Sequence, residues 1–227
     1  MNYVTLLASL GFAQEVCDAH LGKIQVPQFT LTAPYKPQFG FPPMMIPLWS
    51  DGAWPGYIGV ITRWFGGDEA GFVKYYAEEQ ALSEIALTFD QLKAWLAFDF
   101  LCNVPDPDEV GNFAASIGLC AKERVEDYFA HCQEHSDLSA LPAFAIGLPK
   151  FLLNGEEDSQ PGWVRDSVRK PDIETMIAHG QYQQAWHGIN SPGLERDEIA
   201  ALLRLIAPFA NDARFDDLAT CWTQSNQ

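Results

Sequence analysis

Between residues 45 and 87, apolar runs alternate with short turns that contain glycine, serine or aspartate. Residues 57–64 are rich in β-branched and aromatic side chains, which predicts a strand. A second strand fits residues 72–77, where Lys74 on the outer face indicates that one side of the sheet meets water. Residues 81–87 suit either a strand or a helix, because their isoleucine and leucine favour a strand and their alanines favour a helix.

A helix is predicted directly after this region. Thr88 and Gln91 form a capping-box pattern, in which the Thr88 hydroxyl accepts a hydrogen bond from the Gln91 N–H and the Gln91 side chain reaches back. Apolar side chains then recur at helical spacing: Phe89, Leu92, Leu96 and Phe100. The order strand, turn, strand, turn, strand, helix predicts an antiparallel meander with a helix packed on one face.

Short helices are predicted towards both ends of the chain. Near its start, one apolar helix ends at Gly11 and a second short helix ends at Gly22. After the acidic loop at residues 154–162, apolar stripes bounded by glycine and proline predict further helices. These helices span residues 172–179, 182–189, 196–209 and 215–222. Short connections of this kind favour antiparallel packing.

The expected fold class is α+β, with an antiparallel sheet, packed helices and a helical C-terminal extension. At 227 residues the chain is long enough to bury a substantial core. We expect an α+β domain over residues 1–135 and a helical extension over residues 136–227. Prolines and aromatic residues share residues 25–47, which predicts an ordered segment wrapped over the sheet. The alternative for this segment is a proline-rich ligand for another domain.

The charge balance argues against two classes of partner. The chain has 14 basic and 30 acidic residues, which gives a formal net charge of −16. A nucleic-acid surface and an anionic membrane surface both call for clustered lysine and arginine, so neither partner is expected. The charge suits docking to a basic protein, although an acidic surface also serves solubility alone.

Cysteine use and the start of the chain indicate a cytoplasmic protein. The five cysteines are odd in number and form no C-x-x-C motif, which favours free thiols in a reducing compartment. The first twelve residues are largely apolar, but no basic residue precedes Lys23, so a helix is expected there rather than a secretory leader. No run approaches the roughly 18 apolar residues that a membrane span needs.

One short string has the form of a catalytic motif. His131, Glu134 and His135 follow the H-x-x-E-H order of inverzincin peptidases, in which both histidines bind zinc and the glutamate acts as a base. Such an enzyme also needs a distal carboxylate ligand, and histidine near a helix C-terminus is favourable without any metal. A zinc-dependent hydrolase is therefore the alternative hypothesis. The leading hypothesis involves no metal, no cofactor and no catalytic residue.

Aromatic and acidic residues are the candidates for a binding face. Four of the seven tryptophans lie between residues 45 and 100, a density typical of a packed core or a binding surface. The partner-binding residues that we predict lie around the first turn and after the second strand: Trp49, Asp51, Trp54, Tyr57, Glu78 and Glu79. The alternative for Trp49 and Trp64 is a place in the core. Trp54 and Tyr57 flank a Pro-Gly pair and are expected nearer the surface.

The same region resembles the SUKH superfamily. The segments that carry the resemblance lie within residues 45–100 and read IPLWSDGAWPGYIGVI, GFVKYYAEE and SEIALTFDQLKAWL. In that family a sheet strand carries a similar Pro-Leu/Phe-Trp-Ser-Asp segment, and the last strand leads into a helix through a passage similar to residues 85–92. The helix-and-Gly-Gly pattern common near the N-terminus of the family is not visible here.

The resemblance implies an α+β fold that binds proteins, since many members resemble immunity proteins that neutralise secreted nuclease or other toxins between competing bacteria. The leading hypothesis is thus a non-enzymatic, cytoplasmic module whose acidic surface occludes a basic protein partner, with a toxin domain as one candidate. A housekeeping scaffold or regulator of the same fold, with no toxin connection, is a further alternative.

Overall fold

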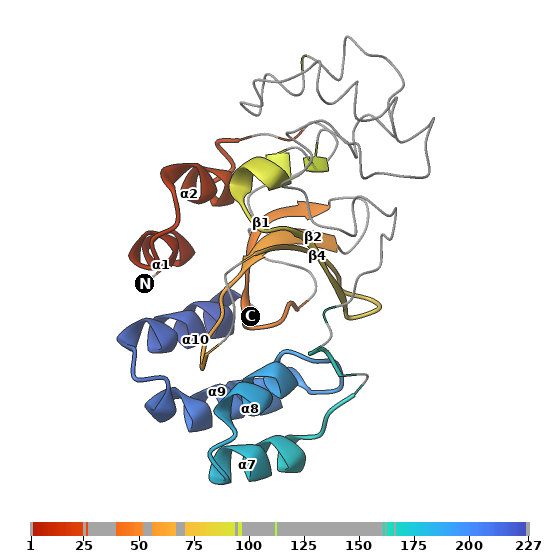
Figure 1. Cartoon of the computed structure of the whole chain (residues 1–227), viewed down its shortest axis with the longest axis vertical. Helices are drawn as coiled ribbons and strands as arrows, with labels where there is room; N and C mark the ends of the chain where they lie inside the picture. Colours follow the sequence, from red (N-terminus) through yellow and green to blue (C-terminus); the bar gives the residue numbers. More distant parts are fainter. Residues whose placement is uncertain are drawn as a thin grey trace, which may run out of the picture.

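A computed structural model shows how these elements are arranged. It describes residues 2–24, 26, 40–51, 56–66, 71–93, 95–96, 112, 161, 163–165 and 167–225. In this part of the chain, two N-terminal helices lie beside a sheet, and a group of C-terminal helices lies below it, with the last of these next to the first N-terminal helix (Figure 1). The predicted α+β fold class is confirmed.

The described sheet is a four-stranded antiparallel meander whose strands follow the order of the chain. Its strands are β1 (Met45–Asp51), β2 (Gly56–Ile61), β3 (Phe72–Tyr76) and β4 (Ala81–Ala86). The ambiguous residues 81–87 thus form a strand up to Ala86, because pairing with β3 and burial of Leu82 and Ile85 outweigh the helix propensity of the alanines. β2 ends before the predicted position, and the left-handed backbone of Phe65 and Gly66 (φ 63° and 93°) then turns the chain.

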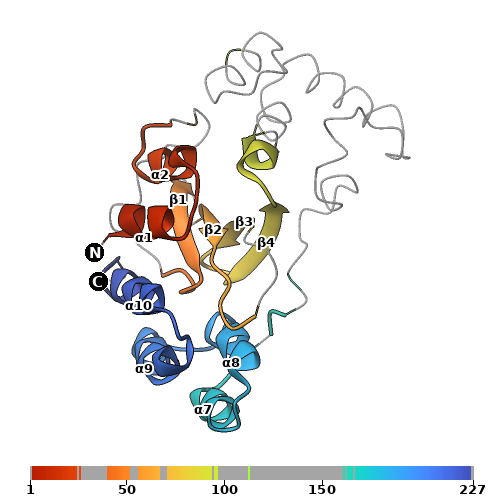
Figure 2. The ribbon, with the colours of Figure 1, turned by 60° about the vertical axis from the view of Figure 1, so that its left-hand side comes forward.

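Two short helices pack beside the edge strand β1 (Figure 2). They are α1 (Tyr3–Ser9) and α2 (Gln14–His20), and the chain turns between them at Gly11, whose φ of 85° suits glycine. The half-buried His20 ring reaches β1, where its Nδ1 lies 2.7 Å from the carbonyl oxygen of Pro47. Pro47 has no backbone N–H to donate. It is tolerated in β1 because this strand lies at the edge of the described sheet, where one side of the strand needs no ladder hydrogen bonds.

The capping box predicted after the sheet is confirmed. The Gln91 N–H donates to Thr88 Oγ1 (3.2 Å), and Gln91 Oε1 accepts from the backbone N–H groups of Leu87 (2.8 Å) and Thr88 (3.3 Å). Residues 89–93 and 95–96 are helical. The helix begins where the sequence predicts it, because this exchange satisfies N–H groups that the first turn leaves without partners.

The C-terminal helices lie across one end of the sheet (Figures 1 and 2). They are α7 (Lys170–Ala178), α8 (Tyr182–Ile189), α9 (Arg196–Ile206), the 3-10 helix η2 (Ala207–Phe209) and α10 (Ala213–Ser225). Their buried side chains join those of the sheet in one hydrophobic cluster, in which the rings of Trp64 and Phe215 lie 5.2 Å apart. The predicted boundary between residues 135 and 136 lies outside the described residues.

Long-range hydrogen bonds join the C-terminal helices to the segment that leads into β1. At the end of α8, Asn190 Oδ1 accepts from the Met44 N–H (2.7 Å), while Asn190 Nδ2 donates to the Trp186 carbonyl (2.8 Å). In α10, Trp222 Nε1 donates to the Phe41 carbonyl (2.7 Å). Buried backbone groups need such partners, so these side chains complete the bonding of a segment beside which the described sheet has no further strand.

Three other expectations can be followed in the described residues. Cys17 and Cys221 are buried free thiols, and the other cysteines lie outside the described part of the chain. The proline-rich residues 25–47 are described only at residue 26 and from residue 40. Within the described ranges, no helix combines the length and apolar character that a bilayer crossing requires.

We expect Asn190→Ala to lower the free energy of unfolding by about 1–3 kcal/mol, because the Met44 N–H and the Trp186 carbonyl would each lose a buried partner. Urea denaturation followed by tryptophan fluorescence measures the change. Gln184→Ala, at an exposed position of the same helix, is the matched control and should stay within about 0.5 kcal/mol of the unmodified protein. Equal effects of the two substitutions would contradict the role of Asn190.

Candidate functional site

The turn between β3 and β4 presents the clearest acidic feature among the predicted site residues. Tyr76 pairs with Ala81, so residues 77–80 form the loop of a hairpin, closed by the left-handed Gln80 (φ 51°). Glu78 and Glu79 are both exposed in this loop. Neither forms an ion pair with another described residue. Two adjacent carboxylates therefore stand at the turn, and no cation of the described residues pairs with either of them.

Two of the predicted partner-binding aromatics belong to the core. Trp49 is 1% exposed, its indole N–H donates to the Ile24 carbonyl (3.1 Å), and its ring stacks with Phe89. Tyr57 is 3% exposed and meets Phe41 edge to face. The expectation that Tyr57 lies near the surface is wrong, because β2 is an inner strand of the described sheet and all of its residues are buried. Both side chains therefore serve packing.

The remaining predicted positions are placed only in part. Asp51 is the last residue of β1, and Trp54 lies outside the described residues. Trp64 is buried, in agreement with the alternative prediction that it belongs to the core. Of the six predicted positions, the structure thus brings Glu78 and Glu79 together on one exposed turn.

The zinc alternative rests on His131, Glu134 and His135, which all lie outside the described residues. Among the residues that are described, no group of three or more histidine, cysteine, aspartate or glutamate side chains is arranged to hold a metal ion. The described part of the chain therefore adds no ligand to this motif.

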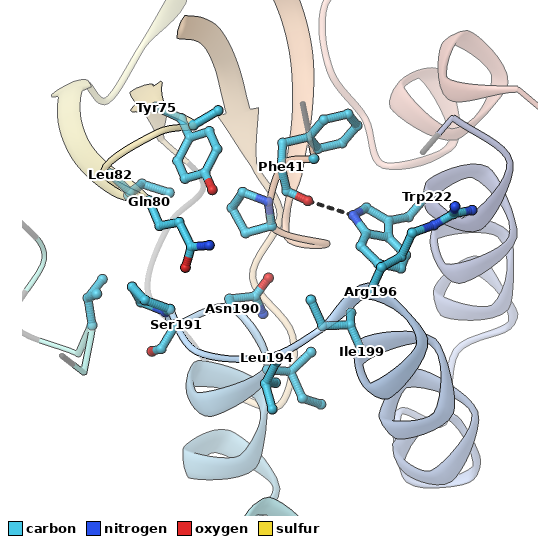
Figure 3. Close-up of a pocket in the computed structure, with 16 residues that line it drawn as sticks. Phe41, Tyr75, Gln80, Leu82, Asn190, Ser191, Leu194, Arg196, Ile199 and Trp222 are labelled. Carbon is cyan, nitrogen blue, oxygen red and sulfur yellow. Dashed lines mark hydrogen bonds between the residues drawn. The ribbon is translucent and has the colours of Figure 1, made fainter. Parts of the chain in front are cut away.

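A cavity of about 350 Å³ opens beside the acidic turn (Figure 3). Ala77 and Gln80 of the turn belong to its wall, and so do Tyr75 and Leu82 of the adjoining strands. The opposite walls come from residues distant in the sequence: Gly40, Phe41, Pro42, Val164, Ile189, Asn190, Ser191, Pro192, Leu194, Arg196, Ile199 and Trp222. The cavity thus lies at the junction of the sheet and the C-terminal helices.

Some polar groups of this cavity already form hydrogen bonds within the protein, and others do not. The Asn190 amide is held by the Met44 N–H and the Trp186 carbonyl, and Ser191 Oγ donates to the His187 carbonyl (2.8 Å). The Tyr75 hydroxyl forms no hydrogen bond with another described residue, and Figure 3 shows this group turned into the cavity. Burial, with a smaller contribution from nearby Tyr57, raises the pKa of Tyr75 to about 12, so its O–H stays protonated at neutral pH.

Sequence patterns did not identify Tyr75, Gln80 or Asn190 as site residues. Tyr75 lies within a predicted strand, and Asn190 begins a predicted turn, so each had an ordinary structural explanation. Their shared position depends on the packing of the C-terminal helices with the sheet and on the Asn190 bond to Met44, which no local spacing reports.

Comparisons of the chain with models of protein families, with curated proteins and with solved structures found no match. The resemblance to the SUKH superfamily therefore remains a prediction carried by the motif residues between positions 45 and 100.

Two histidines are expected to make stability depend on pH. Burial lowers the pKa of His20, whose Nδ1–H donates to the Pro47 carbonyl. Burial and then the nearby Arg63 and Arg165 lower the pKa of His187, which stacks on Trp163. Because both folded-state pKa values lie below the unfolded value of about 6.5, the histidine contribution is full above that pH and is lost as pH falls through the lowered values.

Urea midpoints at pH 7.5 and pH 5.5 measure this effect in the unmodified protein and in a His20→Gln/His187→Gln variant. We expect the unmodified protein to lose more stability on acidification than the variant. Reduced repulsion among carboxylates acts on both proteins and cancels in the comparison. An equal or smaller loss in the unmodified protein would contradict the assignment.

Proposed function

We propose that this protein is a non-enzymatic, cytoplasmic module that binds a basic protein through the acidic β3–β4 turn, in the manner of SUKH immunity proteins. The observation that carries this proposal is the exposed pair Glu78 and Glu79, which no described cation neutralises. The net charge of −16 adds a long-range field of the same sign.

Several other acidic residues of the described chain form ion pairs. Glu84 lies 2.6 Å from Arg63, and Asp18 lies 2.7 Å from Lys23. Glu78 and Glu79 form no ion pair with a described residue, and they lie on a hairpin whose strands belong to the sheet. A rigid support lowers the entropy cost of binding, because the charged loop is already held in position.

The resemblance to the SUKH superfamily supports protein binding as the molecular function and neutralisation of a toxin as the biological role. The residues that carry the resemblance stabilise the fold and do not form a binding surface: Trp49 and Leu92 are buried, and Thr88 caps a helix. To block the active surface of a partner, the folded domain also needs an exposed binding surface. The acidic turn supplies such a surface, and it needs neither a metal nor a catalytic side chain.

A tagged full-length chain tests the proposal by capture of a partner from the native cell and elution with a salt gradient. We expect one basic protein, identified by mass spectrometry, that is released as salt rises because exposed charge pairs are screened. Glu78→Gln/Glu79→Gln should weaken the affinity for that purified protein about tenfold at low salt, as expected for the loss of two exposed charge interactions.

Asp216→Asn/Asp217→Asn, on α10, removes the same number of charges from another place and is the matched control. We expect this control to keep most of the affinity. Equal weakening by both double variants would show a general effect of net charge, and an unchanged affinity of the Glu78/Glu79 variant would remove the turn from the interface. Either result would overturn the proposal.

A further inference from the structure

The cavity beside the turn has the size and the walls of a small-molecule site. Its volume of about 350 Å³ lies in the range of roughly 300–1,000 Å³ that is usual for ligand pockets. Polar and apolar atoms share its lining about equally, and the apolar side chains come from the sheet, the segment before β1 and the C-terminal helices: Phe41, Leu82, Ile189, Leu194, Ile199 and Trp222. A ligand in this space would bury apolar surface on several sides.

The walls are held in place before any ligand binds. The Trp222 indole is tied to the Phe41 carbonyl, and Asn190 is tied to the Met44 N–H. These bonds cross from the C-terminal helices to the segment before β1, so opposite walls of the cavity are joined directly. Preformed walls reduce the ordering cost that binding would otherwise carry.

The free polar groups point to a hydrogen-bonding ligand. Figure 3 shows the polar ends of Tyr75, Gln80 and Asn190 turned toward the same space. Asn190 is already engaged on its oxygen and its nitrogen, whereas the Tyr75 hydroxyl and the amide of the exposed Gln80 form no hydrogen bond with another described residue. The O–H of the largely buried Tyr75 is therefore a donor available to an acceptor atom of a ligand in the cavity.

The charge of the lining disfavours ions. None of the described residues that line the cavity is acidic, although the chain has 30 acidic residues. The single charged lining residue in the described set is Arg196, which is exposed and donates from Nη2 to the Thr223 carbonyl (3.1 Å). Figure 3 shows its guanidinium beside Trp222, away from Tyr75 and Gln80. A charged group deep in the cavity would lose hydration without a counter-charge.

We propose that this cavity binds a small, uncharged molecule that has an apolar part and a hydrogen-bond acceptor, with the Tyr75 hydroxyl as the donor to that acceptor. This site is separate from the charge contact proposed for Glu78 and Glu79. Ligand binding here goes beyond partner recognition, and it can be tested without any partner protein.

Three probes of similar size and different charge test the proposal on the full-length protein: methyl benzoate, benzoate and benzylamine. Titrations followed by two-dimensional amide NMR measure their affinities. We expect saturable binding of methyl benzoate and at least fivefold weaker binding of both charged probes. Tyr75→Phe should weaken methyl benzoate binding about fivefold, which is the effect of losing one neutral hydrogen bond.

Ile199→Trp fills the cavity from α9 and should abolish binding. Leu205→Trp places the same side chain on the same helix at a position that is 44% exposed, and it should bind methyl benzoate as the unmodified protein does. Amide spectra of both variants establish that they are folded. Glu78→Gln/Glu79→Gln should also retain probe binding, which separates this site from the proposed partner contact.

Absence of saturable binding by methyl benzoate would overturn the proposal. So would a charged probe that binds as tightly as the ester, or an Ile199→Trp variant that is folded and still binds. An unchanged affinity in Tyr75→Phe would overturn the assignment of Tyr75 as the donor.

Discussion

The arrangement of this protein depends on a buried side-chain amide, that of Asn190, which joins the end of α8 to the segment before β1. The N–H of Met44 precedes the edge strand β1, and within the described sheet no strand lies beyond that edge. Asn190, 146 residues later, accepts this N–H and donates to the Trp186 carbonyl of its own helix. Because an unpaired N–H in this position would be costly, the bond selects one placement of α8 against the sheet.

That placement has two consequences for binding. The C-terminal helices share a hydrophobic cluster with the sheet, so the β3–β4 hairpin projects from a supported frame. The same packing leaves a cavity between the hairpin, the segment before β1 and helices α8 to α10. Large aromatic side chains fill the space around the junction, as where Trp186 and Phe215 meet with ring centroids 5.3 Å apart. The support of the acidic turn and the formation of the cavity thus both follow from the packing of the C-terminal helices on the sheet.

Charge is distributed unevenly over this frame. The chain is strongly acidic, yet the described lining of the cavity has no carboxylate and the turn beside it has two exposed ones. Desolvation explains the difference, because a carboxylate in the cavity would lose water without a compensating cation, whereas one on the turn remains hydrated. An exposed anionic turn and a cavity whose described lining has no carboxylate can therefore serve different ligands from neighbouring positions.

The sequence by itself determined the local elements and the fold class. β-branched runs indicated β2 and β3, the Thr88–Gln91 pattern marked a helix start, and α8 was predicted at its observed bounds, because these signals act between near neighbours. Tertiary structure decided that residues 81–86 form a strand, that Tyr57 is buried, and that Tyr75, Gln80 and Asn190 meet at one cavity. Those outcomes depend on pairing and packing between distant segments, whose free energies local patterns do not contain.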